Sequence, residues 1–95
     1  MKYEKFLPIG SVVLLKNGKH RIMVTGFCYI DNNNDSKMYD YRGCLYPEGV
    51  IDDSNLILFN HDQINKVFYL GLSDKEEKNF KSALVSTVEI VNKNK

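Results

Sequence analysis

The sequence has no tryptophan, two cysteines and two prolines among 95 residues, and it lacks an excess of either charge. Thirteen Lys and Arg residues face twelve Asp and Glu residues, which gives a formal net charge of +1. Proteins that coat nucleic acid or an anionic membrane are normally strongly basic, so this balance argues against both classes. No apolar run approaches the roughly 18–20 residues of a transmembrane helix, so no membrane insertion is expected.

The beginning of the chain does not have the form of a signal peptide. Its short apolar run is interrupted by Pro8 and Gly10, and no small-residue cleavage site follows. The segment is therefore predicted to be a strand, and a cytoplasmic location is expected for the protein.

The scarcity of cysteine argues against a zinc site, because Cys28 and Cys44 form no C-x-x-C motif and no second pair is present. Two reduced, buried thiols are the favoured interpretation. A single disulfide is the alternative, because both cysteines fall in predicted strands that could be neighbours.

The composition is that of an ordinary globular protein, with 43% hydrophobic and 26% charged residues. At this length residues 1–95 are expected to form a single domain. Apolar runs between turn-forming residues predict five short strands and then one helix. The strands are predicted at residues 11–15, 20–30, 37–46, 56–59 and 66–72, followed by a helix at 73–91 and a polar tail at 92–95.

Turn-forming residues separate these elements. Asn17-Gly18 predicts a type I′ hairpin turn, because both residues tolerate a positive φ. Gly26 interrupts the second strand, as a bulge or a sharp bend would. Pro47 and Gly49 predict a turn after the third strand, since proline fixes φ and glycine supplies the reverse φ.

Two capping boxes mark helical N-termini. Asn60 with Gln63 predicts one helical turn before the last strand, and Ser73 with Glu76 predicts the start of the C-terminal helix. The fold class is therefore α+β, mainly β. We expect a small, strongly bent antiparallel sheet or SH3-like barrel of about five strands with a C-terminal helix. An open antiparallel sheet with the helix across one face is the alternative to a barrel.

The second strand predicts an exposed apolar face. Strand alternation puts Met23, Phe27 and Tyr29 on the same face, whereas the single helix covers only one face of a sheet. With Leu56 or Ile57 they would form a contiguous apolar patch, which usually marks a binding partner. In the alternative, sheet twist and covering loops bury these side chains.

No calcium site is predicted, although the loop after the second strand resembles the start of an EF-hand. Asp31, Asn33 and Asp35 have the required spacing. However, Ser36 stands where glycine is needed, and Arg42 stands where a bidentate glutamate belongs.

His61 beside Asp62 is the remaining candidate for acid–base chemistry. A general base needs a nucleophile or substrate beside it, and the sequence indicates none. The first turn of a capped helical segment explains both residues. Two histidines without H-x-x-x-H spacing or a cysteine partner also make a poor metal site. No nucleotide-binding or G-x-S-x-G motif occurs, so no catalytic residue, metal or cofactor is predicted, and the protein is not expected to be an enzyme.

RNA binding is an alternative that the charges disfavour. Lys37, Tyr39, Tyr41 and Arg42 interleave along the third strand, as basic and aromatic residues do in RNA-binding barrels. Asp40 stands among them, and the net charge is only +1. Tyrosine on a strand is more often part of the core or of a cross-strand pair.

The chain resembles a known family in three segments, which read LPIGSVVLLKNGKHRIMVTGF, YDYRGCLYPEG and LFNHDQINKVFYLG. Tyr-Pro-Glu-Gly followed by Phe-Asn-His is the most specific feature. The family is domain of unknown function 4176, small proteins of Gram-positive Firmicutes that are often encoded beside type VII secretion genes and LXG-type toxins. The resemblance covers about residues 7–80.

The resemblance implies a non-enzymatic accessory role of chaperone or targeting type, in which the protein binds a secreted toxin or its helical partner. An exposed apolar sheet face suits this role, because it could hold an amphipathic helix. The residues expected to contact the partner come from the apolar face and from the two motifs: Met23, Phe27, Tyr29, Tyr46, Pro47, Glu48 and His61.

Three alternatives stay open. The protein could be an immunity protein that binds the catalytic domain of an LXG-type toxin, or a small barrel that binds RNA. A homodimer could also use the apolar face or an unpaired strand edge. Pro47, Glu48 and His61 could serve turn geometry alone.

Overall fold

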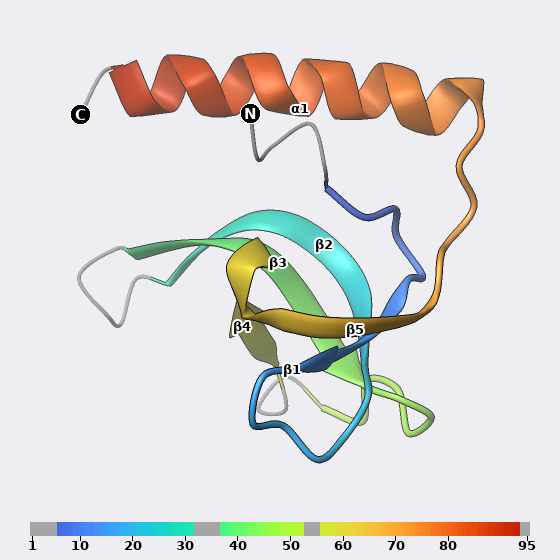
Figure 1. Cartoon of the computed structure of the whole chain (residues 1–95). Helices are drawn as coiled ribbons and strands as arrows, with labels where there is room; N and C mark the ends of the chain where they lie inside the picture. The colour runs from blue at the N-terminus through green and yellow to red at the C-terminus, as the bar shows by residue number, and fades with distance from the viewer. Residues whose placement is uncertain (1–5, 32–36, 53–55, 94–95) are drawn as a thin grey trace.

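The computed structural model describes residues 6–31, 37–52 and 56–93, with one helix lying across a strongly curved sheet (Figure 1). The elements in chain order are β1 (Val12–Leu15), β2 (Ile22–Asp31), β3 (Lys37–Leu45), β4 (Ile57–Phe59), the 3-10 helix η3 (His61–Gln63), β5 (Ile64–Tyr69) and α1 (Lys75–Lys93). All five predicted strands are found, and their ends differ from the predicted ends by at most three residues.

The five strands are antiparallel and follow the order β4-β3-β2-β1-β5. Within the described residues β4 and β5 are the two edges, and the single turn of η3 connects one edge to the other. The backbone N–H of Lys16 donates to the carbonyl oxygen of Gln63 at 2.8 Å, which holds η3 against the end of β1. The predicted α+β, mainly β class is confirmed. The sheet is bent and open, and it is not closed into a barrel.

The predicted interruption at Gly26 is a β-bulge. The pairing of β2 with β3 shifts between Val24 and Gly26, so Thr25 is an extra residue in β2. An extra residue reverses the alternation of side chains beyond it. Phe27 therefore packs against the same core as Val24, and the prediction that Phe27 shares a face with Met23 is wrong.

The predicted two-residue hairpin turn is also wrong. Asn17 has a φ of 63°, but Gly18 is not among the residues with a positive φ. The ladder between β1 and β2 ends at Val13 and Ile22, so a longer loop joins these strands. In contrast, the predicted turn after β3 is confirmed. Gly49 has a φ of 79°, and its N–H donates to the carbonyl oxygen of Leu45 at 2.8 Å.

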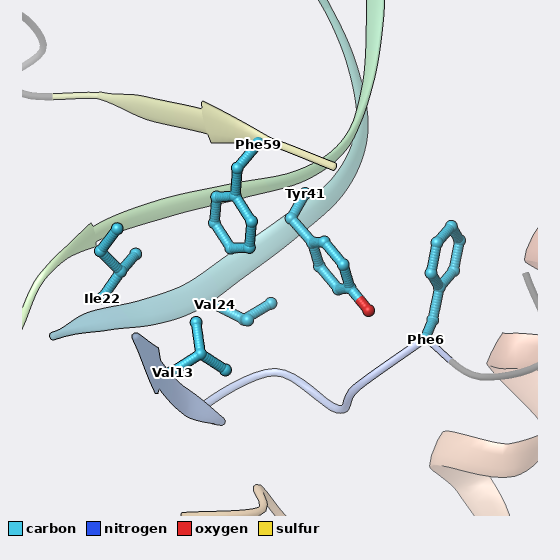
Figure 2. Packing of buried hydrophobic residues seen from close by; sticks show 6 residues of the cluster. All are labelled: Phe6, Val13, Ile22, Val24, Tyr41 and Phe59. Atoms are coloured by element: carbon cyan, nitrogen blue, oxygen red, sulfur yellow. The ribbon is translucent and has the colours of Figure 1, made fainter. Parts of the chain in front are cut away.

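The buried core lies on the concave side of the sheet (Figure 2). It comprises Phe6, Val13, Ile22, Val24, Tyr41 and Phe59. The segment before β1 runs between the sheet and α1 (Figure 1), and Phe6 is 1% exposed there. The helix packs on this layer through Leu84, which is partly buried, and through Phe80, whose ring centroid lies 6.0 Å from that of Phe27.

A tight junction ties the end of β5 to the start of β1. The N–H of Gly71 donates to the hydroxyl oxygen of buried Ser11 at 2.9 Å. A Cβ atom on residue 71 would collide with the carbonyl oxygen of Ile9. Only glycine permits this close approach of two backbones.

The N-cap of α1 is Asp74 and not the predicted Ser73. The N–H of Glu77 donates to Oδ1 of Asp74 at 2.9 Å, and the N–H of Lys78 donates to its carbonyl oxygen at 3.0 Å. Ser73 instead donates its hydroxyl to the carboxylate of Glu77 at 3.1 Å. The helix consequently begins at Lys75, and it continues through Lys93 into part of the predicted tail.

Across the part of the chain that the structure describes, no helix is long and apolar enough to cross a bilayer. Residues 32–36 of the calcium-loop-like segment lie outside the described residues. Within them, no group of three or more His, Cys, Asp or Glu side chains could hold a metal ion.

Candidate functional site

Exposed apolar side chains gather along the edge strand β5 and the residues that follow it. Val67, Phe68 and Tyr69 are all exposed, and so are Leu70 and Leu72. Edge strands are usually protected by charged residues, by bulges or by covering segments. Four consecutive exposed apolar residues at an edge therefore indicate an interaction surface.

This edge forms one wall of a groove with a volume of about 510 Å³, which we call the outer groove. Its lining comes from the segment before β1, from β1, from the start of β2, from the turn after β3 and from β5: Gly10, Val12, Arg21, Met23, Tyr46, Phe68 and Tyr69. Val12 and Met23 alternate with the core residues Val13 and Ile22, so the groove lies on the face opposite the buried core.

The pairing of the strands brings these residues together. Val12 pairs with Met23 on one side and with Tyr69 on the other, so the short strand β1 supplies the floor of the outer groove. Arg21 directly precedes β2 and Tyr46 directly follows β3. The start of β2 pairs with the end of β3, so these two residues are neighbours. The N–H of Tyr46 donates to the carbonyl oxygen of Arg21 at 2.9 Å.

Among the described residues that line the outer groove, Arg21 is the one with a charged side chain. The guanidinium carbon of Arg21 lies 5.0 Å from the ring centroid of Tyr46 and 5.8 Å from that of Phe68. Lys66 Nζ lies 4.8 Å from the same Phe68 ring. Such cation–π contacts are each worth about 0.5–1 kcal/mol at exposed sites. The groove is thus apolar with a positive rim, and none of the described residues that line it is acidic.

Two of the predicted partner-contacting residues, Met23 and Tyr46, lie in the outer groove. Pro47 and Glu48 are exposed in the turn that begins at Tyr46, beside the groove. Tyr29 is not part of its lining, and the guanidinium carbon of Arg42 lies 5.5 Å from the Tyr29 ring centroid.

Phe27 and His61 belong to the core side of the sheet. Phe27 stacks on Phe6 with ring centroids 5.5 Å apart. The ring of His61 stacks on that of Tyr41 at 5.7 Å. These two predicted contact residues are therefore separated from the outer groove by the sheet.

Sequence reasoning missed Arg21, Phe68 and Tyr69. A signal was present, because residues 67–70 are apolar at every position, whereas a strand with one face in water alternates polar and apolar residues. Such a run predicts either a strand buried on both faces or an edge that has a partner. The local sequence pattern does not reveal that this strand lies at the edge of the sheet.

A cluster of polar side chains on the other face joins three segments. The hydroxyl oxygen of Tyr41 accepts the N–H of Leu7 at 3.0 Å and lies 2.6 Å from Nδ1 of His61. Since the hydroxyl accepts from Leu7, its own proton is available to His61. The N–H of His61 donates to Oδ2 of Asp40 at 2.9 Å, and the N–H of Asp40 donates to Oδ1 of Asn60 at 3.1 Å.

This cluster suits structural hydrogen bonding. Burial raises the pKa of the Tyr41 hydroxyl well above its usual range, and the negative charge of Asp40 raises it further. The hydroxyl therefore keeps its proton and serves as a hydrogen-bond bridge. The capping prediction for this turn is confirmed, because the N–H of Asn60 donates to Oε1 of Gln63 at 2.7 Å.

Both cysteines are free thiols, so the disulfide alternative is not observed. Burial raises the pKa of Cys28 to about 11, and the nearby charge of Asp40 acts in the same direction. Because of this raised pKa, the Cys28 thiol stays protonated at neutral pH. The backbone of Cys28 has a φ of 53°, in the left-handed region that residues other than glycine rarely adopt.

Comparison with known proteins gives one family. The model of a family described as Domain of unknown function (DUF4176) matches residues 6–80. This range includes every residue of the outer groove and ends within the first turns of α1. No curated protein and no solved structure matches the chain.

Proposed function

The chain belongs to the DUF4176 family, and from this membership we propose that it is a non-enzymatic accessory protein of Gram-positive type VII secretion. It acts in the cytoplasm as a chaperone or targeting factor. It binds a secreted toxin, or the helical partner of that toxin, in the outer groove.

The outer groove is the observation that supports this proposal. Its floor of Val12 and Met23 is apolar, and its walls carry the large rings of Tyr46 and Phe68. Aromatic residues and arginine are the types that most often dominate binding energy in protein interfaces. An amphipathic helix laid in such a groove would bury its apolar face against these side chains.

The test is recovery of the partner from the source organism with an affinity-tagged chain. We expect mass spectrometry to identify a secreted toxin or its helical partner. Tyr69→Glu and Met23→Glu should each abolish recovery, because a carboxylate in the apolar groove would be desolvated by the partner. Tyr69 is 63% exposed, so its substitution should leave folding intact.

The matched control is Ile51→Glu. Ile51 is 69% exposed and does not line the outer groove, so the same kind of change there should leave recovery unaltered. Phe27→Glu is unsuitable as a binding variant, because its ring packs in the core and a charge there would disturb folding. If both groove variants retain the partner as well as Ile51→Glu does, the outer groove is not the binding site.

Truncation of the recovered toxin separates two roles. Binding to its helical region supports a targeting or chaperone role. Binding only to its catalytic domain would instead indicate an immunity protein. Recovery of RNA without any protein would argue against both.

A further inference from the structure

The position of Arg21 indicates what chemistry the outer groove recognises. Its guanidinium contacts two aromatic rings that come from different parts of the chain, Tyr46 after β3 and Phe68 in β5. Contacts with rings hold a guanidinium by its faces and leave its planar N–H donors at the edge. Two rings therefore fix the direction of this side chain without using its hydrogen-bonding capacity.

Arg21 has no carboxylate partner within the described residues. Among the described residues, the Arg21 side chain contacts the rings of Tyr46 and Phe68. Lys66 lies on the same Phe68 ring and adds a second positive charge beside the groove. The rim therefore presents two exposed positive charges that a carboxylate of a partner would complement.

Resting on the proposed function, we propose that the outer groove binds an amphipathic helical segment of a protein partner that carries an Asp or Glu side chain beside its apolar face. The apolar face rests on Val12 and Met23. The carboxylate accepts hydrogen bonds from Arg21, in the bidentate geometry that guanidinium and carboxylate groups favour. Arg21 is then the residue that selects among apolar segments.

The charges favour this occupant over a second copy of the chain. A two-fold symmetric contact through the outer groove would place the same patch against itself. Each copy would bring the positive Arg21 and Lys66 and, in the turn beside the groove, the negative Glu48, so both patches would carry a net positive charge, which opposes such a contact. A partner segment with an acidic residue meets the same apolar floor without this repulsion.

The test is a display selection with a library of helical peptides randomised along one face, applied to the purified chain. We expect enrichment of peptides that combine apolar residues with Asp or Glu. Arg21→Gln should retain the apolar preference and lose the acidic one. Arg42→Gln is the matched control, because Arg42 also stacks on a tyrosine but lies outside the groove, and it should select the same peptides as the wild type.

An enriched peptide is then synthesised with its acidic residue intact and with the amide in its place. The wild-type chain should bind the acidic peptide about tenfold or more tightly than the amide peptide, as expected for a charge-assisted hydrogen bond. For Arg21→Gln the two affinities should agree within about twofold, because the pairing group is absent.

The failures of this proposal and of the proposed function are distinguishable. Apolar peptides without acidic enrichment, whose binding Tyr69→Glu abolishes, would overturn the role of Arg21 and leave the groove as a protein-binding site. Absence of any peptide that depends on the groove would overturn both. Self-association that Tyr69→Glu abolishes would put a second copy in the groove, and binding of single-stranded RNA there would put nucleic acid in it. Either result overturns the proposal.

Discussion

The hydroxyl of Tyr41 is the residue-scale link between three parts of the molecule. It binds the backbone of Leu7 before β1 and the imidazole of His61 in η3, while its ring lies in the core on β3. Tyr41→Phe keeps the ring but leaves the partly buried N–H of Leu7 without its acceptor. We expect a loss of about 1–3 kcal/mol in the free energy of unfolding, measured by urea denaturation.

Tyr39→Phe is the control for this prediction. Tyr39 uses its ring in a contact with Lys37, whose Nζ lies 5.2 Å from the ring centroid, and phenylalanine keeps a ring. Its effect on the free energy of unfolding should stay within about 0.5 kcal/mol. Equal effects of the two substitutions would show that the Tyr41 hydroxyl contributes nothing specific.

Cys28 makes the stability depend on alkaline pH. Its thiol has a pKa of about 11 in the folded protein, against an ordinary value of 9.0. As the pH rises above 9, the unfolded chain releases this proton first, and the folded state is disfavoured. The contribution is fully present below pH 9 and is lost between pH 9 and 11. Urea midpoints under reducing conditions should therefore fall more steeply for the wild type than for Cys28→Ala in this window.

Other groups that titrate at high pH are present in both proteins. The thiolate charge of Cys28 also raises the pKa of Tyr41, so the difference between the two proteins reports the thiol together with this coupling. Parallel curves for the wild type and Cys28→Ala between pH 9 and 11 would contradict the assignment of a raised pKa to Cys28. Any difference confined to pH values below 8 would have another cause.

Residue-scale features could be predicted from the sequence where a local rule applied, as at the capping box of Asn60 and Gln63, and not where packing decided. Met23 and Tyr46 line the outer groove, and their contact with a partner stays a prediction. Arg21 was not predicted, because its role depends on rings that lie 25 and 47 positions further along the chain. The bridge between Tyr41 and His61 has the same character, since the two residues belong to different elements.

At the scale of elements, the start of α1 depends on Asp74. The carboxylate accepts the N–H of Glu77, and its negative charge also lies at the positive end of the helix dipole. We expect Asp74→Ala to lower the free energy of unfolding by about 0.5–2 kcal/mol, followed by circular dichroism in urea. Ser73→Ala should have a smaller effect, because its hydroxyl binds the side chain of Glu77 and no backbone group. A larger effect at Ser73 than at Asp74 would reverse the assignment of the cap.

The sequence contains both candidate caps one position apart, each with a glutamate three residues later. Local pattern alone cannot choose between two overlapping capping boxes. In the structure Asp74 is the cap, because its carboxylate accepts the N–H of Glu77. Gly26 is a similar case, since a bulge could be predicted there but its consequence for the orientation of Phe27 depends on the pairing with β3.

At the scale of the whole molecule, the feature that is hardest to predict from the sequence is the antiparallel pairing of β1 with β5. These strands pair residues as far apart as Val12 and Tyr69, and no local signal specifies a pairing over that distance. This pairing makes β5 an edge, turns its apolar run into exposed surface and builds the wall of the outer groove. The family resemblance was confirmed, yet it carries no description of this surface.

The arrangement of the core predicts that α1 is the least stable part of the described fold. The six buried core residues come from the strands and the segment before them. Among the described side chains of α1, Leu84 packs at the margin of this core. Phe80 stays 54% exposed although its ring contacts Phe27. Regions with few buried contacts open locally at a lower free energy than the core. Native-state hydrogen exchange should therefore show weaker protection for the amides of α1 than for those of β2 and β3.

Phe80→Ala tests whether that protection comes from docking on the sheet. Alanine is a better helix former than phenylalanine, so the isolated helix would gain stability from this change. Loss of the half-buried ring should nevertheless lower the protection of α1 by about 1 kcal/mol and leave β2 and β3 unaltered. Lys78→Ala, at an exposed position of the same helix, should leave α1 protected. If β2 and β3 lose as much protection as α1, helix and sheet open as one unit, and the curved sheet is not stable without α1.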